Sequence, residues 1–172
     1  MKRRTALKNL SMAVAGLVAL PAWASGWNPA TLGPVAVLPP AEEALLAELV
    51  ETIIPETDTP GAKTLKVHQF VLRMVQDCYG EVAQNNLNQG LITLDQVAKG
   101  AFEKLFIDLD VTQRTAVLTH LQQSDDPATK AFISLVKNLT IQGYLNSEYV
   151  LLNMMEYKMA PGFYHGCVPL KA

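Results

Sequence analysis

Two acidic side chains separated by a single residue offer the simplest route to acid–base chemistry in this chain. Glu56 and Asp58 lie within the short segment of residues 55–62, and two neighbouring carboxylates can divide the roles of general acid and general base. The same segment contains prolines, threonines and a glycine, which favour turns in which polar side chains bond to the backbone. We therefore favour a structural role for both carboxylates over a small enzyme that uses them.

Neither the histidines nor any cofactor-binding motif provides a second candidate for a catalytic or binding site. His68, His120 and His165 fall on different predicted elements, whereas a metal site needs several ligands to converge. The chain also lacks Cys-x-x-Cys-His for haem attachment, a glycine-rich dinucleotide turn and Gly-x-Ser-x-Gly. We predict no catalytic, cofactor-binding or metal-binding residue in this chain.

The N-terminus has the pattern of an export signal. Arg3 and Arg4 precede an apolar run at residues 10–20 that is short for a membrane span, and small residues favour cleavage after Ala24. The paired arginines resemble the twin-arginine signal, which we favour over an ordinary secretory signal and over an uncleaved anchor. The pattern predicts a signal peptide at residues 1–24 and a periplasmic location.

This export route has a consequence for the rest of the chain. The twin-arginine translocase carries proteins that are already folded, either because they hold a cofactor or because they are bound to a partner that does. Since we predict no cofactor site here, the signal indicates a partner that holds the cofactor.

The two cysteines allow two alternatives in an exported protein. Cys78 and Cys167 can pair within the chain, and closing so long a loop stabilises a fold by roughly 4–5 kcal/mol in the chain-entropy model. Alternatively, Cys167 bridges to a partner subunit and Cys78 is a buried apolar residue. We favour the internal bridge.

Composition and charge limit the classes of protein to which this chain can belong. A chain of 172 residues with 49% hydrophobic and 17% charged residues suits one packed domain. The formal net charge is −2, but four of the 14 basic residues lie in the first eight positions, which leaves 10 basic against 16 acidic residues. A nucleic-acid partner is therefore excluded, because such binding needs clustered Lys and Arg.

One short loop separates the first two predicted helices. Residues 25–40 form an extended arm rich in Pro and Gly, and an amphipathic helix follows until Pro55 stops it near Ile54. The next residues favour a stiff loop that either fixes the angle between two helices or forms a docking surface. The residues of this predicted structural or docking motif are Pro55, Thr57, Asp58, Thr59, Pro60 and Gly61.

The remaining chain favours helices throughout. A second helix is expected at residues 65–82, with Cys78, Tyr79 and Val82 in its apolar stripe, followed by a loop at residues 85–90. Further helices are expected at residues 93–106, 111–123, 127–144 and 147–156, followed by an ordered loop at the C-terminus. Capping boxes at Thr93 with Gln96 and at Asp110 with Gln113 predict the first two starts, and Asp126 with Pro127 predicts the third. The fold class is all-α, a single irregular bundle of about five to six helices at residues 41–172.

Several methionines and tyrosines gather near the C-terminus. Met154, Met155 and Met159, with Tyr149 and Tyr157, either form an adaptable surface for a partner or pack in the core. The sequence favours neither alternative.

Several segments of the sequence match one family pattern. They are the twin-arginine leader, residues 49–62, the helix at residues 67–79, Gly143-Tyr144, Ser147-Glu148, and Pro161-Gly162 through Gly166-Cys167. On these residues the chain resembles the gluconate 2-dehydrogenase subunit 3 family from residue 40 to the end. The specific part is the Ile-Pro-x-Thr-Asp-Thr-Pro-Gly-Ala core at residues 54–62.

The resemblance implies a function that depends on other chains. In such complexes a large subunit of the glucose–methanol–choline oxidoreductase type holds FAD, and a multi-haem cytochrome c subunit passes electrons to the quinone pool. The small subunit carries the export signal for the large one, and the family offers no catalytic residues to transfer to this chain. We expect a non-catalytic escort and stabiliser in the periplasm, held at the inner membrane through its complex. A free-standing periplasmic helical module that binds a ligand or protein is the alternative.

Overall fold

The computed structural model describes residues 38–158, 160 and 162, all within one compact unit. Arg3, Arg4 and Cys167 lie outside the described residues, as do most of the predicted arm and the C-terminal loop. The predicted signal peptide and the boundaries at residues 24 and 40 therefore stay predictions.

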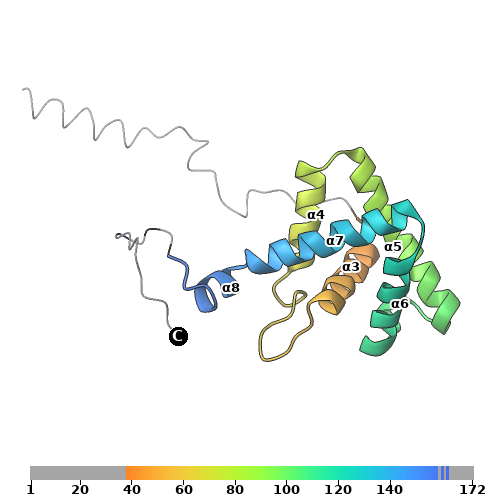
Figure 1. Cartoon of the computed structure of the whole chain (residues 1–172), viewed down its shortest axis with the longest axis horizontal. Helices are drawn as coiled ribbons and strands as arrows, with labels where there is room; N and C mark the ends of the chain where they lie inside the picture. The colour runs from red at the N-terminus through yellow and green to blue at the C-terminus, as the bar shows by residue number, and fades with distance from the viewer. Residues whose placement is uncertain (1–37, 159, 161, 163–172) are drawn as a thin grey trace, which may run out of the picture. The chain divides into compact units, whose positions relative to one another are not determined.

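All regular secondary structure in the described residues is helical, which confirms the all-α class (Figure 1). The helix α7 lies at the centre and contacts all the other α-helices in this part of the chain. The elements in chain order are α3 (Pro40–Ile53), α4 (Val67–Cys78), α5 (Glu81–Phe102), the 3₁₀ helix η2 (Phe106–Asp108), α6 (Val111–Gln123), α7 (Pro127–Leu145) and α8 (Glu148–Asn153).

Side-chain caps set the starts of α6 and α7. Asp110 and Gln113 form the predicted capping box of α6, with Asp110 accepting from the Gln113 N–H at 2.8 Å. The Asp126 carboxylate accepts from the Thr129 N–H at 2.9 Å at the start of α7. The bonds from the Thr129 hydroxyl and N–H lower the pKa of Asp126.

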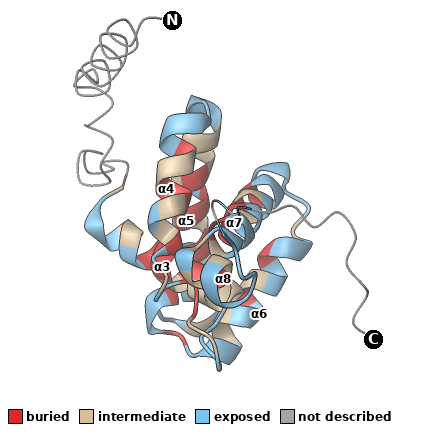
Figure 2. Ribbon diagram, turned by 90° about the vertical axis from the view of Figure 1, so that its left-hand side faces the viewer, coloured by how far each residue is buried: buried red, intermediate tan, exposed pale blue. Residues whose placement is uncertain are grey.

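Apolar stripes of five helices meet in one core, which Figure 2 colours red. The largest buried side chains come from separate elements, such as Leu46 on α3, Leu91 on α5, Phe106 in η2 and Phe132 on α7. Because each stripe buries against the central helix, the position of each helix depends on its neighbours more than on its own propensity.

Two glycines allow the central helix to approach its neighbours closely. A Cβ on Gly90 of α5 would lie 2.1 Å from Cδ2 of the Phe132 ring on α7. A Cβ on Gly143 of α7 would lie 2.6 Å from Cδ1 of Phe70 on α4. Both contacts are shorter than van der Waals packing permits, so the helix pairs require glycine at these positions.

The predicted boundaries are wrong between residues 78 and 106. The second helix ends at Cys78 rather than Val82, because Tyr79 is extended and Gly80 is the N-cap of α5. Cys78, Tyr79 and Val82 are therefore exposed rather than part of the core.

The predicted loop at residues 85–90 is also wrong, because these residues lie inside α5. Thr93 is not a helix cap there, since its hydroxyl donates to the Gln89 carbonyl oxygen one turn earlier. The helix ends at Phe102, where Glu103 adopts the left-handed conformation with φ 57°, so the predicted helix at residues 93–106 is the second half of α5. The last helix likewise ends at Asn153 instead of residue 156.

Among the helices of the described chain, none combines the length and the apolar composition that crossing a membrane requires.

Candidate docking site at the loop of residues 55–62

The loop between α3 and α4 is held by its own backbone. The Ala62 N–H donates to the Ile54 carbonyl oxygen at 3.0 Å, which brings the two ends of the loop together. Within the loop, the Thr57 N–H donates to the Thr59 carbonyl oxygen at 3.0 Å. These bonds form the stiff loop that the sequence predicts.

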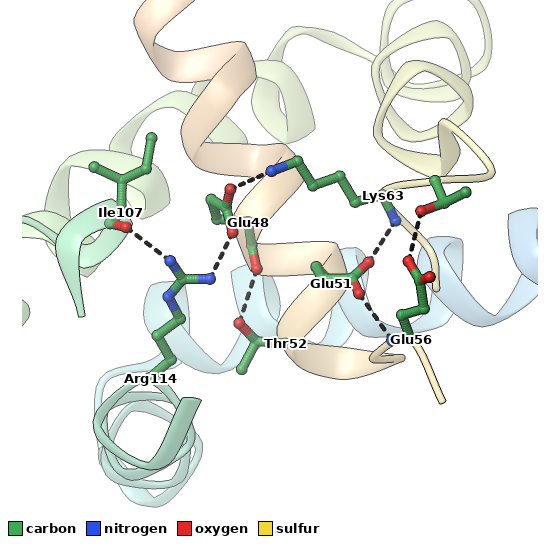
Figure 3. Close-up of polar contacts among 8 residues, drawn as sticks. Glu48, Glu51, Thr52, Glu56, Lys63, Ile107 and Arg114 are labelled. Carbon is green, nitrogen blue, oxygen red and sulfur yellow. Dashed lines mark hydrogen bonds and ion pairs between the residues drawn. The ribbon is translucent and has the colours of Figure 1, made fainter. Parts of the chain in front are cut away.

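A glutamate of the preceding helix joins the two sides of the loop (Figure 3). The carboxylate of Glu51 accepts from the Glu56 N–H through Oε1 and from the Lys63 N–H through Oε2, both at 2.8 Å. Gly61 lies directly against this carboxylate, since a Cβ there would be 2.3 Å from Oε1. The glycine is therefore needed so that Glu51 can reach both donors.

Asp58 does not make the turn bond expected from its residue type. It is exposed, and its carboxylate accepts no hydrogen bond from another described residue, because Glu51 supplies the acceptors instead. The Glu56 carboxylate accepts from the Thr64 hydroxyl at 2.9 Å and is also exposed. Neither carboxylate has the buried environment by which an enzyme sets an acid and a base apart.

A tyrosine from the central helix fixes the loop to the bundle. The Tyr144 hydroxyl donates to the Pro60 carbonyl oxygen at 3.1 Å and lies 3.4 Å from the Thr59 hydroxyl oxygen. Thr59 and Pro60 are half-buried by this contact, while Pro55 and Thr57 remain exposed with Asp58. The predicted motif is thus divided into an anchored half and an exposed half.

A second glutamate ties the same region to α6. Glu48 lies between Lys63 and Arg114, with 2.5 Å from its carboxylate to each cation (Figure 3). Arg114 also donates to the Ile107 carbonyl oxygen at 2.7 Å, and its guanidinium lies 5.7 Å from the centre of the Phe106 ring. Burial pushes the pKa of Glu48 upward, but the bonds and charges of Lys63 and Arg114 outweigh it and lower the pKa below 4.5.

The histidines do not assemble a site in the described residues. His68 is largely buried on α4, with Nε2 3.8 Å from the Glu43 carboxylate, whereas His120 is exposed on α6. Burial is the main cause that lowers the pKa of His68 below 6.5, and Lys63 and Lys66 add to it, although Glu43 acts in the opposite direction.

No group of three His, Cys, Asp or Glu side chains that could hold a metal occurs in the part of the chain that the structure describes. Cys78 is exposed at the end of α4, so the burial expected for it in the partner-bridge alternative is wrong. Because Cys167 lies outside the described residues, its pairing with Cys78 and its bridge to a partner subunit both stay predictions.

Replacing Gly61 with alanine should cost about as much stability as removing the Glu51 carboxylate. The new methyl group can be accommodated only if Glu51 swings away, which breaks both bonds to the loop. We expect a loss of about 1–2 kcal/mol in Gly61→Ala and in Glu51→Ala, since these charged bonds are partly exposed. Chemical denaturation of the Glu51→Ala/Gly61→Ala double variant measures the coupling between the two positions, and the double variant should lose only as much stability as either single variant. If the stability losses of the two single variants simply added in the double variant, this contact between Gly61 and Glu51 would be contradicted.

His68 should make folding sensitive to mild acid. A group with a lowered pKa contributes stability that is present above its unfolded pKa and is lost as the pH falls toward its folded pKa. The free energy of unfolding should therefore decline as the pH falls below the ordinary histidine pKa of 6.5, and His68→Gln should flatten that decline. His120→Gln, which alters an exposed histidine, is the matched control. A His68→Gln profile parallel to the wild type would refute this assignment.

The protein is thus a helical bundle in which the loop of residues 55–62 is held by hydrogen bonds from Glu51 and Tyr144 and is partly exposed. A family model described as gluconate 2-dehydrogenase subunit 3 matches residues 40–162. The chain therefore belongs to the gluconate 2-dehydrogenase subunit 3 family. Comparisons with curated proteins and with solved structures gave no match.

Proposed function

We propose that this chain is a non-catalytic subunit of a periplasmic dehydrogenase complex, in which it escorts and stabilises a flavoprotein. The observation that carries the proposal is the family match over residues 40–162, whose description makes the chain one subunit among several. The partner is an FAD-dependent dehydrogenase of the glucose–methanol–choline type that performs the oxidation. A multi-haem cytochrome c is the further partner that receives the electrons.

The leader supplies the second part of the proposal. Arg3 and Arg4 direct the chain to the twin-arginine translocase, which accepts folded cargo. A flavoprotein that binds FAD in the cytoplasm must be exported folded, and one bound to this chain needs no signal of its own. The escort role thus explains why a folded-export signal occurs on a chain in which we predict no cofactor site.

The rigid loop supports a role in assembly. Its conformation is fixed by Glu51, Gly61 and Tyr144, while Pro55, Thr57 and Asp58 remain exposed. A preorganised surface loses little conformational entropy when a partner binds it. This arrangement favours a docking role for the exposed half of the motif over a role in helix geometry alone.

Co-purification tests this proposal. The reading frames next to this chain should encode the flavoprotein, and the two should be expressed together with an affinity tag on this chain. We expect the flavoprotein to co-elute and to carry the visible absorbance of flavin. The alternative, a free-standing binding module, predicts a colourless monomer, and that result would overturn the proposal.

A further inference from the structure

Half of the exposed large apolar side chains in the described residues belong to α7, α8 and the turn after them. They are Ile141, Leu145, Leu152, Met154, Met155 and Tyr157, with exposed fractions of 39–55%. The turn after α8 is ordered by its backbone, because the N–H groups of Met155 and Tyr157 donate to carbonyl oxygens of α8 at 3.0 and 2.8 Å. We call Leu152, Met154, Met155 and Tyr157 the α8 patch.

A groove adjoins the α8 patch. It encloses about 590 Å³ between the start of α4 and the junction of α7 with α8. Leu65, Phe70 and Leu152 give it apolar walls, and Glu148 and Asn153 add polar groups. Because Leu152 belongs to both features, the groove and the α8 patch are continuous at this end of the bundle, which faces the viewer in Figure 2.

The loop of residues 55–62 is tied to the same end of the bundle through its anchored half. Tyr144 bonds to Pro60, and it lies next to Gly143, which lines the groove. The loop leads directly into Leu65 and Lys66 of the groove wall. Lys66 is held in the left-handed conformation with φ 54°, an arrangement that persists only where the surrounding structure enforces it. The loop, the groove and the α8 patch thus lie together at one end of the bundle.

We propose that this end of the bundle is the surface on which the flavoprotein subunit docks. The inference rests on the proposed function, which requires a subunit interface, and it locates that interface. Met and Tyr are enriched in interface cores, and Met adapts its shape to a partner. The partner should insert an apolar side chain into the groove and present basic or hydrogen-bond-donor groups to Glu148 and Asp58, which are exposed acids at this end.

The charge at this end disfavours a lipid surface as the occupant. Anionic membranes attract clusters of about four to eight Lys or Arg residues. Among the described residues, Lys66 lines the groove and Lys158 directly follows Tyr157 of the α8 patch, and Glu148 and Glu156 offset their charges. A protein surface with complementary charge is therefore the favoured occupant.

The test compares two variants of the full chain, each co-expressed with the flavoprotein. Leu152→Glu/Met155→Glu places two charges in the α8 patch, where both side chains are 55% exposed. Val82→Glu/Val111→Glu is the matched control, because these exposed apolar residues lie on α5 and α6. We expect the first variant to capture at least about tenfold less flavoprotein, as for the loss of interface hot spots, and the control to capture a normal amount. Both should keep the wild-type melting temperature.

The outcomes separate this inference from the proposed function. If the wild-type chain captures no flavoprotein, the proposed function fails and the docking surface fails with it. If both variants capture flavoprotein as the wild type does, only the location of the docking surface is overturned.

Two further measurements test other occupants of the surface. If the wild-type chain alone is a dimer and Leu152→Glu/Met155→Glu is a monomer, the surface belongs to a second copy of the chain. Loss of protection from hydrogen exchange at residues 141–158 on deleting residues 163–172 would assign it to the chain's own C-terminus. Either result would overturn the proposal.

Discussion

Alanine in place of Gly90 should lower the free energy of unfolding by about 1–3 kcal/mol. The added methyl group would lie 2.1 Å from the ring of Phe132, a residue that is 1% exposed and packed in the core. The loss arises although alanine favours helices over glycine by roughly 0.5–1 kcal/mol, so the steric conflict must outweigh the gain in propensity. Urea denaturation of the purified protein measures the change.

Gly100 provides the matched control within the same helix. Nothing lies within 4 Å of a Cβ built there, and the residue is exposed. Gly100→Ala should therefore raise the free energy of unfolding by roughly 0.5–1 kcal/mol. The close approach of α5 and α7 would be contradicted if Gly90→Ala were as stabilising as Gly100→Ala.

Replacing Arg114 with methionine should cost about 2–4 kcal/mol, because it removes one partner of a largely buried charged group. The Arg114 and Glu48 side chains are 14% and 15% exposed. The change also removes the bond to the Ile107 carbonyl oxygen and the contact with the Phe106 ring. Lys63 still faces Glu48 in the variant, which keeps the cost below that of an isolated buried charge.

The cost of Arg114→Met should depend on pH in a defined direction. The lowered pKa of Glu48 contributes stability above the ordinary value of 4.5, and that stability is lost as the pH falls through the folded value. The difference between wild type and variant should therefore shrink in acid. Lys130→Met is the control, since its 3.9 Å contact with Asp125 is exposed and should be worth less than about 1 kcal/mol. Equal effects of the two substitutions at neutral pH would contradict a central role for Arg114.

Features that depend on neighbouring residues could be predicted from the sequence. Pro55 ends the first helix, Asp110 and Gln113 form the capping box of α6, and Asp126 with Pro127 opens α7. In each case the relevant hydrogen bond or steric clash involves residues at most four positions apart. Local chemistry alone therefore determines these boundaries.

Features that depend on tertiary packing could not be predicted in this way. Asn85, Asn86, Asn88 and Gly90 favour a loop, yet they lie in a continuous helix whose stripe includes Leu87 and Leu91. Gly90 allows the close contact with the ring of Phe132, a residue that is remote in the sequence. Packing of the apolar stripe overrides the weak local preference of Asn and Gly.

The role of Glu51, which holds the loop of the candidate site together, could not be predicted from the sequence either. Glu51 accepts from backbone groups five and twelve residues later, and a glutamate near the end of an amphipathic helix is usually solvated. The one available signal was the pairing of a glutamate one turn before Pro55 with a glycine at the far side of the loop. Asp58, which the residue type favoured, makes no bond that holds the loop together in the described chain.

The location of the dehydrogenase activity tests the escort role most directly. The full chain should be expressed with the flavoprotein, either as the wild type or as Arg3→Lys/Arg4→Lys, and the activity measured in periplasmic and cytoplasmic fractions. The double substitution keeps the positive charge that an ordinary secretory signal needs but removes the paired arginines. We predict that the activity moves from the periplasm to the cytoplasm in the variant. Normal periplasmic activity in the variant would contradict the escort role.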